Sequence, residues 1–270
     1  MRPALLAVLF AAWLPLAAAD RPLAIMPLGD SITAAADPGY RGFLYRMLVD
    51  SGHAVHFVGT QSAKPSMPEG VTLDPDHEGH GGFSIGPGPS AADGWTNGKG
   101  NLYANLDDWL GPAQAKTRDV DIILLHVGVN DFANIKERDP GYDLVRDLPT
   151  RYAGLLDKIL SLHPKVAIIM SSIIPGGNPD INAVFPVGPF DQINPRLKDI
   201  AARRSSHVFF RDGAALEGTG LKWEPSDWNK GDVVHPNAQG QKKFATFWCT
   251  AITGMIDQGK LPKKPYVKQP

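Results

Sequence analysis

Short runs of apolar residues alternate along the chain with segments whose apolar residues recur every three or four positions. Five runs have the length and composition of buried strands, at residues 23–28, 55–58, 122–129, 166–174 and 208–210. Helical spacing occurs between them and after them, over residues 43–48, 148–162 and 244–255. Because the two patterns alternate, they predict an α/β fold in which helices cover both faces of an open parallel sheet.

In such a sheet, binding and chemistry take place beyond the carboxyl ends of the strands. Two long segments with little predicted regular structure, residues 61–100 and 175–189, are expected to pass over that edge. There is no internal repeat and no linker, so we predict one domain over residues 20–259.

Both ends of the chain differ in composition from the predicted domain. Residues 1–19 combine Arg2, an apolar run and three alanines before Asp20, as in a secretory signal peptide, and the run is too short to span a bilayer. Residues 260–270 contain four lysines and three prolines, which predicts a basic, disordered tail. We therefore expect a secreted or periplasmic protein.

Charge and cysteine content narrow the possible functions. Lys plus Arg total 27 and Asp plus Glu total 28, so the net charge of −1 gives no support for binding to nucleic acid or to an anionic membrane. Cys249 is the only cysteine, so an exported form has no internal disulfide and depends on its hydrophobic core for stability.

A candidate nucleophile follows the first predicted strand. Ser31 lies in the sequence Gly-Asp-Ser-Ile-Thr at residues 29–33, where a strand ends and a helix can begin. At such a position a hydroxyl is exposed and backbone N–H groups converge on a developing oxyanion. The pentapeptide alone is a weak signal.

A candidate base lies near the end of the domain. Asp232 precedes His235 by three residues, which allows its carboxylate to accept a hydrogen bond from imidazole Nδ1 and leaves Nε2 free to take a serine proton. A lone Asp-x-x-His pattern is more often typical of a structural histidine. Other residues must therefore show whether His235 is catalytic.

Two further residues have the chemistry of oxyanion donors. Asn130 follows the strongest predicted strand, in Gly-Val-Asn-Asp, and Gly82 ends the sequence Gly-His-Gly-Gly. An asparagine amide and an unobstructed glycine N–H both stabilise negative oxygen. The alternative interpretation of each is a turn residue.

Together these blocks resemble the SGNH branch of the GDSL hydrolases, whose four naming residues correspond to Ser31, Gly82, Asn130 and His235. Longer blocks at residues 25–33, 39–41, 57–59 and 76–80 look like the carbohydrate esterase family 3 acetylxylan esterases. The similarity covers residues 23–256.

The resemblance implies a three-layer α/β/α, flavodoxin-like fold with about five central parallel strands. It implies a serine esterase without metal or other cofactor that removes acetyl groups from plant polysaccharide. It makes Ser31 the nucleophile, His235 the base and Asp232 its orienting partner, with Ser31, Gly82 and Asn130 as oxyanion donors. We expect a monomer acting on acetylated polysaccharide or another small ester. Family members usually carry Ser-Gly-Trp where this chain has Gly-Gly-Phe at residues 81–83, which leaves the substrate fit at that loop open.

Three other patterns allow different chemistry. Ser84 lies in a G-x-S-x-G sequence, but the strand and helix that a nucleophile elbow needs are not predicted around it. His77 and His80 are three residues apart among glycines rather than four apart on a helix, so they fit a zinc site poorly. His126, inside an apolar run, has the pattern of a core histidine.

Three tryptophans, Trp95, Trp223 and Trp228, lie in predicted loops and are candidates either for stacking on sugar rings or for anchoring those loops. Two other functions also stay open. The same catalytic residues serve lipases, thioesterases and acyltransferases, and the scaffold could bind carbohydrate without catalysis.

Overall fold

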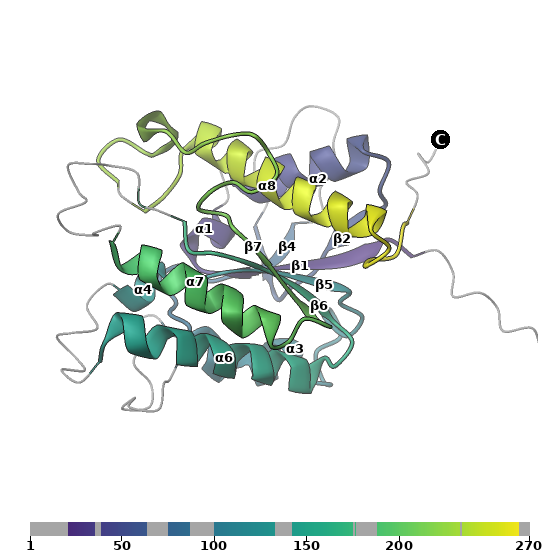
Figure 1. The fold of residues 1–270 in the computed structure, drawn as a ribbon. Coiled ribbons are helices and arrows are strands. Elements are labelled where there is room, and N and C mark those ends of the chain that lie inside the picture. Colours follow the sequence, from purple (N-terminus) through teal and green to yellow (C-terminus); the bar gives the residue numbers. More distant parts are fainter. Residues whose placement is uncertain are drawn as a thin grey trace, which may run out of the picture.

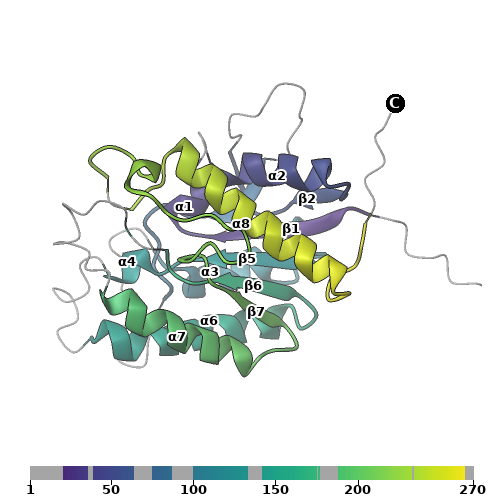
Figure 2. The same cartoon turned by 45° about the horizontal axis from the view of Figure 1, so that its top comes forward.

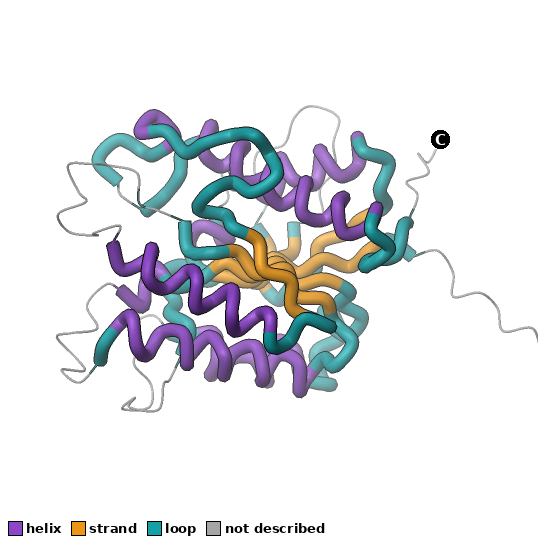
Figure 3. Tube along the Cα trace, viewed as in Figure 1, coloured by secondary structure: helices purple, strands orange, loops and turns teal. Residues whose placement is uncertain are grey.

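The computed structural model describes residues 21–35, 39–63, 75–86, 100–132, 142–174, 176, 188–232 and 234–264. A central sheet lies between two layers of helices (Figure 1), and the strands form the inner layer of the tube trace (Figure 3). Its strands in chain order are β1 Leu23–Gly29, β2 Val55–Phe57, β3 Gln61–Ser62, β4 Asp76–Gly79, β5 Ile122–His126, β6 Ala167–Ser171 and β7 Val208–Arg211.

The sheet has the order β3-β4-β1-β5-β6-β7, with β2 also paired to β1. All pairs are parallel except β3 with β4. The predicted three-layer architecture is confirmed, with a seven-stranded sheet rather than about five strands. The additional β3 and β4 lie within residues 61–100, so the expectation of little regular structure there was partly wrong.

Burial on both faces explains why the central strands are continuously apolar. Alternate residues of β1 pack into different halves of the core: Ala24, Met26 and Leu28 on one face, Leu23 and Ile25 on the other. This is the period of two that a pleated strand imposes.

Helices α2 Tyr40–Asp50 and α8 Ala238–Asp257 cover one face of the sheet. Helices α3 Leu102–Leu110, α6 Leu144–Leu162 and α7 Gly188–Ala202 cover the other, as Figures 1 and 2 show. The three predicted helical segments are confirmed as α2, α6 and α8. Trp109 was expected in a helical stripe and lies buried in α3, whereas α7 was not predicted, although it buries Phe190, Ile193 and Leu197 at helical spacing.

Strand β5 ends three residues earlier than predicted. The apolar run continues to Val129, but Gly128 adopts a φ of 124° and the short helix α4 Val129–Phe132 begins at once. A side chain at Gly128 would be strained at this φ and would meet Ile173. The strand predicted at residues 166–174 is likewise shorter in the structure, where it is β6, Ala167–Ser171.

The predicted signal peptide, residues 1–19, lies outside the described residues. The predicted tail is not wholly separate from the domain, because Leu261 is only 5% exposed and the Lys264 carbonyl accepts a hydrogen bond from the Ala54 N–H. At least Leu261 and Lys264 therefore contact the domain. Within the described ranges, no helix has both the length and the apolar character required to cross a bilayer.

Candidate active site

Ser31 is the first residue of helix α1, Ser31–Ala34, immediately beyond the carboxyl end of β1. Asp30 caps this helix, because its Oδ1 accepts a hydrogen bond from the Ile32 N–H at 3.0 Å. A Cβ atom at Gly29 would lie 2.1 Å from the His126 carbonyl oxygen, so only glycine fits where β1 leads into the helix. The sequence thus places the serine hydroxyl at the edge of the sheet.

Three side chains form a continuous hydrogen-bonded chain at this edge. The Ser31 Oγ lies 2.7 Å from His235 Nε2, and His235 Nδ1 lies 2.7 Å from Asp232 Oδ2. The fold therefore brings the three residues together in the order that nucleophilic catalysis requires.

Asp232 fixes both the loop and the tautomer of the imidazole. Its Oδ1 accepts hydrogen bonds from the backbone N–H groups of Val234 at 2.8 Å and His235 at 3.1 Å. Partial burial raises the pKa of Asp232, but these bonds and the one with His235 outweigh it and bring the pKa below its usual value. An ionised carboxylate accepts from Nδ1–H, which leaves the Nε2 lone pair facing Ser31.

The loop that carries His235 is tied to helix α8. Asn237, the N-cap of α8, donates its side-chain amide to the carbonyls of Ser226 at 2.7 Å and Trp228 at 3.1 Å. The His235 carbonyl accepts from the Asn229 backbone N–H at 3.2 Å and side-chain amide at 3.1 Å. These hydrogen bonds therefore hold the loop that carries the His235 imidazole.

Gly82 lies in a tight turn next to these residues. The turn runs from His80 to Phe83, closed by the Phe83 N–H donating to the His80 carbonyl at 3.2 Å, and Gly82 has a φ of 81°. Two bonds join the turn to the segments of the other candidate donors. The His80 N–H donates to the Gly29 carbonyl at 2.9 Å, and Asn130 Nδ2 donates to the Phe83 carbonyl at 3.0 Å. One hydrogen of the Asn130 amide is thus used to orient it, and the second has no acceptor recorded among the residues that the structure describes.

Two buried carboxyl groups flank the candidate donors. Burial raises the pKa of Asp30 to about 7, and its Oδ2 has no partner among the described residues. Asp131 follows Asn130, and burial also raises its pKa. Its Oδ2 accepts from the Ile85 N–H at 2.9 Å, and its Oδ1 lies 3.5 Å from the buried Arg151 guanidinium.

Sequence reasoning missed Arg41, which holds the backbone just after the serine. Its fully buried guanidinium donates to the Thr33 carbonyl at 3.0 Å and to the carbonyls of Ala35, Ala63 and Pro75, each at 3.3 Å. Burial lowers its pKa to about 10, so it stays cationic at neutral pH. The signal that could have identified it is a charged residue next to Tyr40 at the start of the apolar pattern of α2.

The structure also places the residues of the other patterns. Ser84 is fully buried, and its backbone pairs with Gly100 and Leu102. His77 Nδ1 accepts from the Gly79 N–H, whereas His80 bonds Glu78. No group of three or more potential metal ligands occurs among the residues that the structure describes.

His126 is buried against Phe244, with 5.1 Å between the ring centroids. Burial lowers the pKa of its imidazole to about 3, so the ring is neutral in the core.

The described tryptophans pack into the protein. The Trp223 indole donates to the Gly213 carbonyl at 2.9 Å and packs on Trp228 at 5.3 Å between ring centroids. Trp228 is only 6% exposed, so its ring offers little surface to a sugar. This arrangement favours the loop-anchoring interpretation for both. Trp95 lies outside the described residues.

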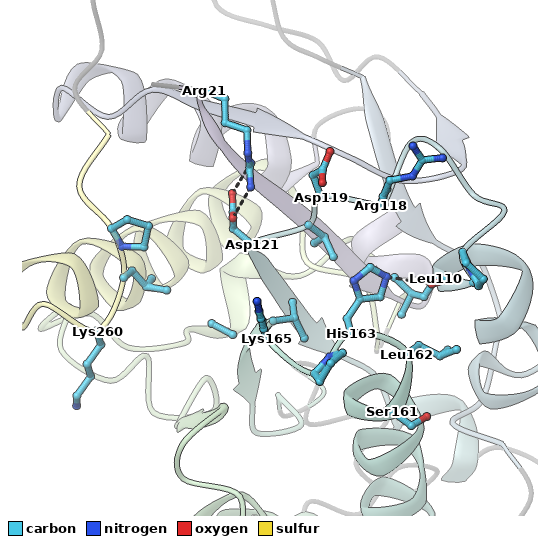
Figure 4. A pocket seen from close by; sticks show the side chains of 18 residues that line it. Arg21, Leu110, Arg118, Asp119, Asp121, Ser161, Leu162, His163, Lys165 and Lys260 are labelled. Carbon is cyan, nitrogen blue, oxygen red and sulfur yellow. Dashed lines mark hydrogen bonds and ion pairs between the residues drawn. The ribbon is translucent and has the colours of Figure 1, made fainter. Parts of the chain in front are cut away.

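A depression of about 740 Å³ lies at the opposite edge of the sheet (Figure 4). There Arg21 makes two 2.7 Å contacts with Asp121, and His163 Nε2 lies 2.9 Å from the Leu110 carbonyl at the end of α3. Arg118 and Lys165 also line this depression. Ser31, Asp232 and His235 do not line this depression.

Comparison with known proteins agrees with this geometry. The chain is 28% identical over 270 residues to a multidomain esterase of Ruminococcus flavefaciens, covering 94% of this chain and 32% of the relative. The chain thus spans about a third of that protein's length. Its fold is similar to that of a carbohydrate esterase family 3 protein from Talaromyces cellulolyticus, with a TM-score of 0.62 and 22% identity, covering 87% of this chain and 99% of that one.

A family 3 carbohydrate esterase from Clostridium thermocellum gives a TM-score of 0.58 and 24% identity, covering 87% of this chain and 98% of the other. The model of the GDSL-like lipase/acylhydrolase family matches residues 28–243, a range that includes Ser31 and His235. The chain belongs to the GDSL-like lipase/acylhydrolase family, and its α/β fold is similar to those of the two family 3 carbohydrate esterases.

Proposed function

We propose that this esterase is exported and removes acetyl groups from plant polysaccharide, most specifically from acetylated xylan. The observation that carries the proposal is the 2.7 Å contact between Ser31 Oγ and His235 Nε2, backed by the 2.7 Å contact of His235 with Asp232. The structural similarity to two family 3 carbohydrate esterases supports a carbohydrate ester as the substrate.

The first half-reaction forms an acetyl-enzyme. Ser31 Oγ attacks the acetyl carbonyl while its proton passes to His235 Nε2, and the resulting oxyanion accepts hydrogen bonds from the N–H groups of Ser31 and Gly82 and from Asn130 Nδ2. When the tetrahedral intermediate collapses, the carbon–oxygen bond to the sugar breaks. The sugar oxygen takes the proton from His235 and leaves as an alcohol.

The second half-reaction uses water in place of the sugar. His235 accepts a proton from water as the water oxygen attacks the acetyl-enzyme, and the same three donors hold the second oxyanion. Collapse passes the proton from His235 to Ser31 Oγ and releases acetic acid, which ionises to acetate in solution. Asp232 keeps the imidazole in the required tautomer and stabilises its protonated form throughout.

Because each role is assigned to a protein group, activity is expected to survive incubation with EDTA. Loss of activity on chelation, followed by recovery when a divalent metal is added, would contradict this mechanism.

Acetate release from acetylated xylan tests the substrate. Ser31→Ala protein is the blank, and Ser161→Ala is the matched control, because Ser161 is an exposed serine whose Oγ only bonds the Lys158 carbonyl. We expect wild-type and Ser161→Ala proteins to release acetate and Ser31→Ala protein to release none. Xylan binding without acetate release would favour a catalytically silent carbohydrate-binding protein.

Acyl chain length separates the remaining esterase functions. Hydrolysis of short soluble acetates without action on xylan would retain the mechanism and reject the polysaccharide. A preference for long acyl chains or for thioesters would favour a lipase or thioesterase, and transfer to an alcohol in place of water would favour an acyltransferase.

The proposed export predicts where the mature chain begins. If residues 1–19 are a cleaved signal peptide, N-terminal sequencing of the protein recovered outside the cytoplasm should begin at Asp20. Recovery of a chain that still begins at Met1 would contradict cleavage.

A further inference from the structure

The imidazole of His80 packs against two aromatic rings, which also contact each other at 6.2 Å between their centroids. Its centroid is 4.1 Å from that of Trp109, with 6° between the planes, and 4.8 Å from that of Phe83, with 26° between the planes. Its Nε2 lies 2.6 Å from Glu78 Oε1. The ring is therefore restrained by the stacked Trp109, by Phe83 beside it and by the bond of Nε2 to Glu78.

Glu78 is itself fixed. Its fully buried carboxylate accepts hydrogen bonds from the Thr60 backbone N–H at 2.6 Å and from Thr60 Oγ1 at 2.7 Å. Buried carboxylate oxygens with several donors are held rigidly, because any movement leaves a polar atom unsatisfied. The bond to Glu78 thus links His80 to the segment that follows β2.

His80 begins the turn that contains Gly82. Its backbone N–H donates to Gly29, two residues before Ser31, and its carbonyl accepts from Phe83, whose own carbonyl orients Asn130. Displacement of His80 would therefore move the Gly82 N–H relative to both Ser31 and Asn130. The phenylalanine that replaces the family's tryptophan at position 83 contributes its ring to this stack.

We propose that His80 is a positioning residue, which holds the Gly82 turn at the distance from Ser31 and Asn130 that oxyanion binding requires. This inference rests on the proposed roles of Gly82 and Asn130. An oxyanion donor loses most of its effect when it is displaced by a fraction of an ångström, because the stabilisation depends on preorganised geometry. His80 acts through the turn and takes no part in proton transfer.

A double-mutant cycle in the full-length protein tests the inference. His80→Ala should lower kcat on p-nitrophenyl acetate by about 10- to 100-fold with KM changed less than about threefold, since the lost interaction belongs to the transition state. Combined with Asn130→Ala, the total loss should be smaller than the product of the two single losses, because a displaced site gains less from Asn130.

His163→Ala is the matched control. His163 also bonds through Nε2, but to Leu110 at the opposite edge of the sheet, so its loss should leave kcat within about twofold. If His80→Ala does not fold, His80→Phe keeps the stacked ring and removes only the bond to Glu78. Its kcat should fall at least about threefold, with the same non-additivity.

Unchanged kcat in the folded His80 variant, or multiplicative losses in the cycle, would overturn the positioning role. If Asn130→Ala alone retains full kcat, the oxyanion assignment fails and the positioning role fails with it. Loss in Asn130→Ala but not in the His80 variant rejects only the positioning role.

Discussion

The His235 imidazole contacts the Ser31 hydroxyl at 2.7 Å although the two residues are 204 positions apart in the sequence. They meet because Ser31 begins α1 beyond the end of β1, while His235 lies on the loop before α8, the helix that packs against α2 on one face of the sheet. The contact is therefore a product of the tertiary fold.

The Asp232 carboxylate is expected to control the tautomer of His235. Asp232→Asn keeps an oxygen for the backbone N–H groups of Val234 and His235, but its amide can donate to Nδ1 and favour the wrong tautomer. We expect kcat to fall by about 10² to 10⁴ with little change in KM. Steady-state kinetics with p-nitrophenyl acetate measures this, and the exposed Asp50→Asn is the control. A fall of less than threefold would contradict the role.

Asn130 is expected to act in the transition state. Asn130→Ala should lower kcat by about 10² to 10³, the usual cost of one oxyanion donor. The control Asn105→Ala removes an amide that bonds the Asn101 carbonyl on α3, and should leave kcat unchanged. Near-normal kcat in folded Asn130→Ala protein would show that its amide does not contact the oxyanion.

Arg41 is expected to contribute strongly to stability. Arg41→Ala removes the guanidinium donor from four backbone carbonyls, of which that of Pro75 still accepts from the Ala63 N–H, and we expect the free energy of unfolding to fall by about 3 to 5 kcal/mol. Arg46→Ala on the same helix removes an exposed pair with Asp50 and should change stability little. Urea unfolding followed by circular dichroism compares the two variants. Equal losses in the free energy of unfolding would contradict the stabilising role of Arg41.

Asp30 is expected to make stability depend on pH. Its carboxyl has an ordinary pKa of 3.8 when exposed and about 7 when buried in the fold. Between these values the folded state holds a proton that the unfolded state has lost, so the free energy of unfolding falls as pH rises. From pH 5 to 7 the expected loss is about 2 kcal/mol.

Asp30→Asn should remove the Asp30 contribution to this slope, because the amide keeps an acceptor for the Ile32 N–H and does not ionise. Buried Asp131, whose pKa is also raised to about 7, should keep its own contribution. Urea unfolding of both proteins at pH 5, 6 and 7 measures the difference. Parallel pH dependence in the two would show that Asp30 does not titrate in this range.

The central strands could be predicted because they are covered on both faces, which makes their sequences continuously apolar. Strands β3 and β4 could not, since they are built from polar residues such as Gln61 and Asp76. Glu78 in β4 is buried only because Thr60 and His80 satisfy its carboxylate, and no local pattern shows such partners.

The candidate site divides in the same way. Ser31, Asp232 and His235 are recognisable from short motifs, because each motif contains the local geometry that its residue needs. The bond from Asn130 to the Phe83 carbonyl joins positions 47 residues apart. Its acceptor is a main-chain oxygen, which is present whatever the residue type at position 83. Only the folded chain shows it.

The path of β1 bears on how the enzyme can be attached to a surface. β1 carries the chain from Leu23 at one edge of the sheet to Gly29 at the other, about 20 Å at 3.3 Å per residue. Lys264 bonds Ala54, just before β2, at the same edge as Leu23. In Figure 2 the described chain enters and leaves on the side away from α1. A bead, a fluorophore or a fused module attached close to Arg21 or Lys264 would therefore lie at the opposite end of β1 from Ser31.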